Sequence, residues 1–191
     1  MANITRLTDN LFTGGDLPPF APDHLEHIED WVEAGITHVI DNRIEWTDED
    51  LVAEHAPQIV YLHHGVDDAG QQMPDSWFDD GVAFALEAMA QPGSTVLAHC
   101  HMGINRGPSL ALAILLAQGW DVIDALDRIR TQRPIAMVGY AEDALDWWHR
   151  KVGASDTARA SDRRRLAAWR KANWIDLARI IRELRREEES A

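Results

Sequence analysis

The hydrophobic residues divide the chain into short apolar runs and longer stretches with helical spacing. The apolar runs predict strands over residues 10–15, 36–40, 59–63 and 94–99. The helical spacing predicts helices over residues 22–33, 75–90, 106–118, 121–132 and 141–152. Because strands and helices alternate, the sequence favours an α/β domain with a central, mostly parallel sheet flanked by helices.

Charged residues are spread unevenly over the 191 positions, whose formal net charge is -14. Residues 1–150 hold 25 acidic and 7 basic residues and no lysine, whereas residues 151–191 hold 7 acidic and 11 basic residues. The two parts therefore carry net charges of -18 and +4. This break predicts a main domain over residues 1–152 and a basic C-terminal extension over residues 153–191.

The extension is predicted to form one amphipathic helix over residues 161–189. Its partial apolar face consists of Leu166, Trp169, Ile180, Ile181 and Leu184. The favoured interpretation is a helix docked on its own acidic domain, where opposite charges pair. The alternatives are a partner-binding or self-associating arm and a helix that rests on an anionic membrane.

Composition excludes several classes of protein. A single cysteine excludes an internal disulfide framework and any Cys-rich metal module. With no leader-like segment at the start and no apolar run near 18 residues, we expect a cytoplasmic protein without a transmembrane segment. The acidic balance argues against general nucleic-acid binding. No cofactor is expected.

The stretch HCHMGINRGPS, residues 99–109, carries the candidate chemistry because it joins a predicted strand to a predicted helix. A loop from Cys100 to Arg106 can turn its backbone N–H groups inward, and such a loop at a helix N-terminus binds a tetrahedral dianion. The positive electrostatic potential of these N–H groups also favours the thiolate form of Cys100, and a thiolate is a nucleophile. Arg106 supplies a planar fork that matches two phosphoryl oxygens, and Gly103 can adopt a positive φ.

The remaining loop residues are predicted to form the substrate-binding wall, with His99 supporting the loop through a hydrogen bond. The wall consists of His101, Met102, Gly103, Ile104 and Asn105. The plain alternative for Cys100 is a small buried hydrophobe. A metal cluster of His99, Cys100 and His101 with His63 and His64 is the less favoured interpretation of the histidines, so no metal site is predicted.

These residues resemble a known family. HCHMGINR is similar to the His-Cys-x5-Arg signature of the cysteine-based protein tyrosine phosphatases, most closely the small dual-specificity type. The stretches ITRLTDNLFTGG, THVIDNR and IRTQRPIA fit the resemblance in the expected order, over roughly residues 4–150. It implies a phosphatase-type P-loop and hydrolysis of phosphate monoesters, with phosphotyrosine, phosphoserine and phosphothreonine of proteins favoured, through a phosphocysteine intermediate.

The resemblance also implies a general acid, an aspartate some thirty residues before the cysteine. The stretch HHGVDDAGQQMPD places Asp67 and Asp68 at 33 and 32 residues before Cys100. Asp68 is favoured because it lies nearer the glycine-containing turn and aligns with the family's D-x-G-x-x-x-P run. Asp67 is the alternative, and either residue could be an ordinary solvated loop acid.

The sequence departs from the family pattern directly after the arginine. A Ser or Thr usually stands there and helps the cysteine leave, but this chain has Gly107, and Ser109 lies two positions too late. We expect phosphocysteine breakdown to be slowed. The alternatives are a phosphate-binding pseudophosphatase that acts as an interaction module, and an RNA, nucleotide or lipid phosphatase of the same fold. Few basic residues in the first 150 argue against highly anionic inositides.

Overall fold

A computed structural model describes residues 3–18 and 23–188. Its centre is a five-stranded sheet in the order β1-β2-β5-β3-β4, in which only the β1–β2 pair is antiparallel among the described strands. The strands are β1 (Ile4–Arg6), β2 (Leu11–Gly14), β3 (His38–Arg43), β4 (Val60–Val66) and β5 (Val96–His99). The predicted fold class, α/β with a mostly parallel central sheet, is confirmed.

The middle strand β5 fixes where the HCHMGINR loop begins. His99, its last residue, pairs with Gly14 of β2 on one side and with Asp41 of β3 on the other. Cys100 follows directly, so it emerges at the carboxyl edge of the parallel strands. Loops at this edge commonly form the ligand site of open α/β sheets.

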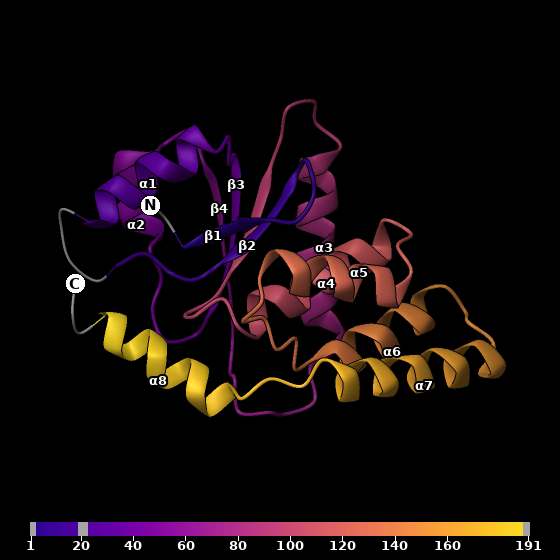
Figure 1. Cartoon of the computed structure of the whole chain (residues 1–191). Coiled ribbons are helices and arrows are strands. Elements are labelled where there is room, and N and C mark those ends of the chain that lie inside the picture. The colour runs from indigo at the N-terminus through magenta and orange to yellow at the C-terminus, as the bar shows by residue number, and fades with distance from the viewer. Residues whose placement is uncertain (1–2, 19–22, 189–191) are drawn as a thin grey trace.

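Helices cover both faces of the sheet (Figure 1). One face carries α1 (Asp23–Glu33) and α2 (Glu49–His55), whose buried side chains form a small core with β2, β3 and β5. The other face carries α3 (Asp75–Met89), α4 (Arg106–Ala117), α5 (Val122–Gln132) and α6 (Ala141–Lys151), which form the larger core. Residues 110–115 of α4 are fully buried, as expected of a helix that is apolar on all sides. The helix that follows the loop is therefore held rigidly.

The prediction of one helix over residues 161–189 is wrong. The extension forms α7 (Asp156–Ala172) and α8 (Leu177–Glu188), and Glu189 lies outside the described residues. Helix α7 begins earlier because Ser155 caps it, accepting a hydrogen bond from the Ala158 amide at 3.2 Å. Asp176 accepts from the Arg179 amide at 2.9 Å and begins a new helix after a break at residues 173–176.

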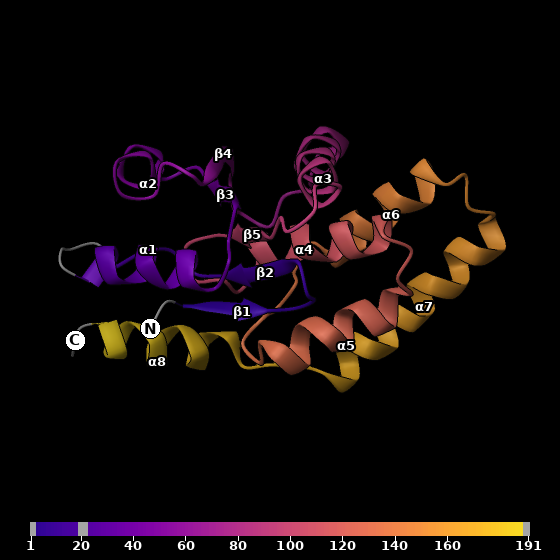
Figure 2. The same ribbon diagram turned by 90° about the horizontal axis from the view of Figure 1, so that it is seen from above.

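Helix α7 packs along α5 and α6 (Figure 2). Leu166 and Trp169 belong to the larger core, and the Trp169 indole donates to Asp127 at 2.6 Å. Arginines of α7 pair with acidic residues of the main domain, Arg163 with Asp146 at 2.8 Å among them. Helix α7 thus shares the larger core with the main domain.

Two short elements are missing from the sequence prediction. Strand β1 has three residues, and α2 has seven, of which only Val52 is buried, so neither gives a periodic signal. Strand β3 also runs on to Arg43, through polar residues that look like a loop in sequence but are fully buried. The helix predicted from Pro22 is described from Asp23, since Pro22 lies outside the described residues.

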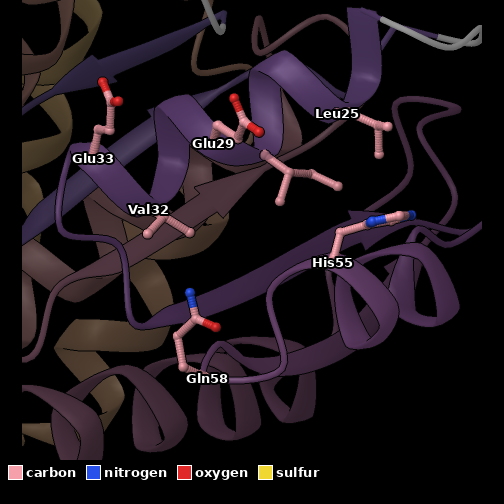
Figure 3. Close-up of a pocket in the computed structure, with 7 residues that line it drawn as sticks. Leu25, Glu29, Val32, Glu33, His55 and Gln58 are labelled. Carbon is pink, nitrogen blue, oxygen red and sulfur yellow. The ribbon is translucent and has the colours of Figure 1, made fainter.

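A groove of about 350 Å³ lies between α1 and α2 (Figure 3). Apolar and acidic side chains of α1, such as Val32 and Glu29, face His55 and Gln58 across it. None of its lining residues belongs to the loop of residues 99–106. Among the described helices, none combines the length and apolarity needed to cross a membrane.

Candidate active site

The loop of residues 100–105 turns its backbone carbonyls outward. The His101 oxygen accepts from the Asp16 amide at 3.0 Å, and the Ile104 oxygen accepts from the Met137 amide at 2.7 Å. The buried Arg133 donates to the other two carbonyls, from Nη2 to Met102 at 3.0 Å and from Nε to Gly103 at 2.6 Å. Four successive peptide groups are thereby fixed with their oxygens bonded to the surrounding protein.

The amides of these peptides are left for a ligand. Within residues 3–18 and 23–188, no group accepts a hydrogen bond from the amides of residues 102–105. Gly103 has φ of 63°, and an added Cβ would collide with Gly14 and the Arg133 side chain. Only glycine suits this backbone, which gives the concave set of N–H donors that binds oxyanions.

Cys100 lies at the base of the loop and is only 3% exposed. Its amide donates to the Gly14 carbonyl at 3.2 Å, which ties the loop to β2. It forms no disulfide. The inward amides and the N-terminus of α4 place positive potential around the sulfur.

Arg106 is buried beside Cys100, and its two terminal nitrogens are occupied. Nη1 donates to Glu45 at 2.9 Å and to the Asn42 and Val66 carbonyls at 3.2 and 2.9 Å, while Nη2 donates to Glu45 at 2.9 Å. These hydrogen bonds hold the pKa of Glu45 below its ordinary value. Nε is buried without a hydrogen-bond partner in the described part of the chain. This N–H, which faces Asp68 Oδ2 at 3.5 Å without a hydrogen bond, can donate to an oxygen of an anionic ligand.

Asp68 reaches this site, whereas the Asp67 side chain bonds elsewhere. Asp68 Oδ1 accepts from Asn105 Nδ2 at 2.6 Å and from Tyr140 Oη at 2.8 Å, and its Oδ2 lies 3.5 Å from Arg106 Nε. Asp67 is exposed, and its Oδ1 accepts from the Asp68 amide at 2.8 Å.

His99 is fully buried at the end of β5, and burial lowers its pKa to about 4. Neither ring nitrogen has a hydrogen-bond partner among the described residues. The nearest acidic atom is Asp41 Oδ1, 3.7 Å from Nε2, and the ring packs against Trp31. His99 thus supports the loop by packing as a neutral imidazole rather than through the predicted hydrogen bond.

The other histidines do not gather around Cys100. His101 bonds Asp16 at 2.7 Å, whereas His63 bonds the Arg43 carbonyl and His64 the Trp77 carbonyl. No group of three His, Cys, Asp or Glu side chains suited to a metal occurs in the described residues.

Comparison with known proteins identifies the family. Residues 23–142, more than half of the chain, match the model of the dual specificity phosphatase catalytic domain. The chain belongs to this dual-specificity phosphatase family.

Curated relatives include dual specificity protein phosphatase 26 of Mus musculus, which is 30% identical over 105 residues, 53% of this chain and 48% of that protein. Dual specificity protein phosphatase 1 of Arabidopsis thaliana is 34% identical over 83 residues, 43% of this chain and 41% of that protein. The chain therefore spans about half, or less than half, of the length of these curated relatives.

Solved structures of the same fold include human DUSP28, with a TM-score of 0.64 and 17% identity over 80% of this chain and 97% of that chain. PTPMT1 has a TM-score of 0.63 and 22% identity over 83% of this chain and 98% of that chain. At these identities, the likeness shows the fold alone.

Gly107 departs from the family pattern because α4 approaches β5 closely there. A Cβ at this position would lie 2.8 Å from the Ala98 carbonyl oxygen, a backbone atom. Ser109 is fully buried, and its Oγ accepts from the Tyr140 amide at 3.3 Å. No hydroxyl therefore occupies the usual place of the dual-specificity phosphatase Ser or Thr.

Sequence reasoning missed four residues that hold the site. Arg133 holds the loop carbonyls, and Glu45 and Asn42 hold Arg106. Tyr140 contacts Asp68. The one usable signal is that residues 1–150 contain only 7 basic residues, so each arginine there was a candidate, and Arg106 and Arg133 both lie at the loop.

Proposed function

We propose that this protein is a cysteine-dependent phosphatase that hydrolyses phosphate monoesters, favouring phosphotyrosine, phosphoserine and phosphothreonine of proteins. One observation carries the proposal: the unoccupied amides of residues 102–105 and the buried Nε of Arg106, which donates no hydrogen bond to the described residues, surround the position next to Cys100. This set of donors suits the three equatorial oxygens of a phosphoryl group in transfer.

In the first step, Cys100 Sγ attacks phosphorus and the P–O bond to the leaving group breaks. Asp68 gives its proton to the leaving oxygen. In the second step, water attacks the phosphocysteine while the Asp68 carboxylate takes a proton from it. Inorganic phosphate leaves, and the Cys100 thiolate and protonated Asp68 are restored.

The charge around the site bears on the substrate. The -18 of residues 1–150 opposes highly anionic inositides, and Glu45 adds a half-exposed carboxylate next to Arg106. Phosphoproteins and small phosphomonoesters are therefore the favoured substrates over lipid or RNA phosphates. Because the thiolate must stay reduced, we infer a cytoplasmic location.

Hydrolysis of para-nitrophenyl phosphate by the purified protein tests the function. We expect turnover without added metal and unchanged turnover with a chelator, because the donors and the nucleophile are all protein groups. An inactive protein that still binds phosphate or tungstate would instead indicate the pseudophosphatase.

Gly107 leads to a kinetic prediction. Without the hydroxyl that the family usually places directly after the arginine, breakdown of the phosphocysteine is expected to limit turnover. Rapid mixing with para-nitrophenyl phosphate should therefore give a burst of nitrophenol close to one equivalent per enzyme, followed by a slower steady rate. A linear time course from the first turnover would argue against slow breakdown.

A further inference from the structure

The side chain of Tyr140, which comes directly before α6, contacts the loop that carries Asp68. Its hydroxyl donates to Asp68 Oδ1 at 2.8 Å and accepts from the Gly70 amide at 3.3 Å. Burial, together with the Asp68 hydrogen bond, raises the Tyr140 pKa to about 12, so the hydroxyl keeps its proton at neutral pH. The Tyr140 side chain thus contacts the loop that carries Asp68, here called the acid loop, at two points.

The same hydrogen bonds distinguish the two oxygens of Asp68. Oδ1 accepts from both Tyr140 and Asn105, so it has little capacity left for a proton of its own. Oδ2 lies 3.5 Å from Arg106 Nε, the donor left for phosphate. The proton of the acid is therefore directed to Oδ2, on the side of the phosphoryl group.

The segment that carries Tyr140 is fixed from two directions. On the loop side, the Gly139 amide donates to Asn105 Oδ1 at 2.6 Å, and the Tyr140 amide donates to Ser109 Oγ. On the other side, Arg170 of α7 donates from Nη2 to the Gly139 carbonyl at 3.0 Å and from Nη1 to Glu142 at 2.8 Å.

A second tie joins this segment to the end of α7. Arg130 of α5 donates to the Ala136 carbonyl at 2.9 Å and to the Asn173 carbonyl at 2.7 Å, and it lies over the Trp169 ring. Helix α7 lies wholly beyond residues 23–142, the range that matches the family model.

We propose that α7 sets the position of the general acid, with Arg170 and Tyr140 acting as positioning residues along the path from α7 through Gly139 to Asp68. The proposal rests on the proposed function, because it assumes that Asp68 protonates the leaving group. It assigns to the C-terminal extension a role in the chemistry of the domain on which it packs.

The test compares two substrates that differ in their need for an acid. Nitrophenolate leaves readily without a proton, whereas the more basic phenolate of phenyl phosphate needs one. Tyr140→Phe should lower kcat/KM for phenyl phosphate, which reports the first step and not phosphocysteine breakdown, about tenfold, and Arg170→Ala about threefold, with kcat/KM for para-nitrophenyl phosphate changed less than about twofold. The ratio of the two rates is the readout, because a purely structural defect lowers both.

Arg163→Ala is the matched control. Arg163 also lies on α7 and also pairs with an acidic residue of the main domain, but its side chain bonds Asp146 and not Gly139 or Tyr140. It should leave the ratio unchanged. An unchanged ratio in Arg170→Ala, or an equal loss on both substrates, overturns the proposal.

Hydrogen exchange of the Gly70 amide provides a readout that does not depend on activity. Because this amide donates to Tyr140, we expect it to exchange faster in Arg170→Ala than in Arg163→Ala. Equal exchange rates of the Gly70 amide in the two variants would show that α7 does not position the acid loop. A wild type that hydrolyses neither substrate contradicts the proposed function instead, and the exchange result still decides whether α7 positions the acid loop.

Discussion

Cys100→Ser is expected to lower the turnover of para-nitrophenyl phosphate by at least about 10⁴-fold, because the only proposed nucleophile is removed. A serine hydroxyl stays protonated at neutral pH even among these donors, so it is a much weaker nucleophile than the thiolate. The loss should be in kcat, since the amides of residues 102–105 and Arg106 still bind the phosphoryl group.

Two measurements show that the loss is chemical. The variant should unfold at the temperature of the wild type, because one small buried side chain replaces another, and it should still bind tungstate. The wild type offers a further check: because it has a single cysteine, a trapped phosphoenzyme whose phosphorus is bonded to sulfur must be the phosphocysteine at position 100. Equal activity of wild type and Cys100→Ser would eliminate Cys100 as nucleophile.

The sequence predicted the elements that bury continuous apolar residues. Helix α4 and strand β5 are apolar along their length and were located within one or two residues. Elements held by polar contacts were not found. The end of β3 is stabilised by Arg43, which bonds Asp41 at 2.7 Å and Asp48 at 2.6 Å, and such pairing gives no hydrophobic pattern.

The site was predictable only where it is local in sequence. Residues 99–106 form one contiguous loop, so their order alone indicates an oxyanion site. The residues that position Arg106 and Asp68 are distant in sequence. Glu45 lies 61 residues from Arg106, and Tyr140 lies 72 residues from Asp68. Their partners are set by the packing of the whole domain, which spacing cannot show.

The extension shows the same limit. Its charge sets it apart from the acidic domain in composition, whereas Leu166 and Trp169 of its predicted apolar face lie in the larger core. Charge does not reveal that Arg170 reaches the Gly139 carbonyl, next to Tyr140. A boundary in composition near residue 153 is therefore not a boundary in packing.

Asp68→Asn is expected to lower kcat/KM for phenyl phosphate, which reports the first step, about 10²-fold or more, because an amide cannot donate a proton to the departing phenolate. Asparagine keeps the size of the side chain and its carbonyl can still accept from Tyr140 and Asn105, so the loop should stay in place. Turnover of para-nitrophenyl phosphate should fall much less when the first step is measured in the burst.

Asp67→Asn is the matched control, one residue away. Its amide oxygen can still accept from the Asp68 amide as the carboxylate does at 2.8 Å, and the side chain is exposed, so both substrates should turn over nearly as in the wild type. The difference between the two variants follows from geometry, since Asp68 Oδ2 lies 3.5 Å from Arg106 Nε. Equal rates of the two variants on phenyl phosphate would refute Asp68 as the acid, and a larger loss in Asp67→Asn would transfer that role to Asp67.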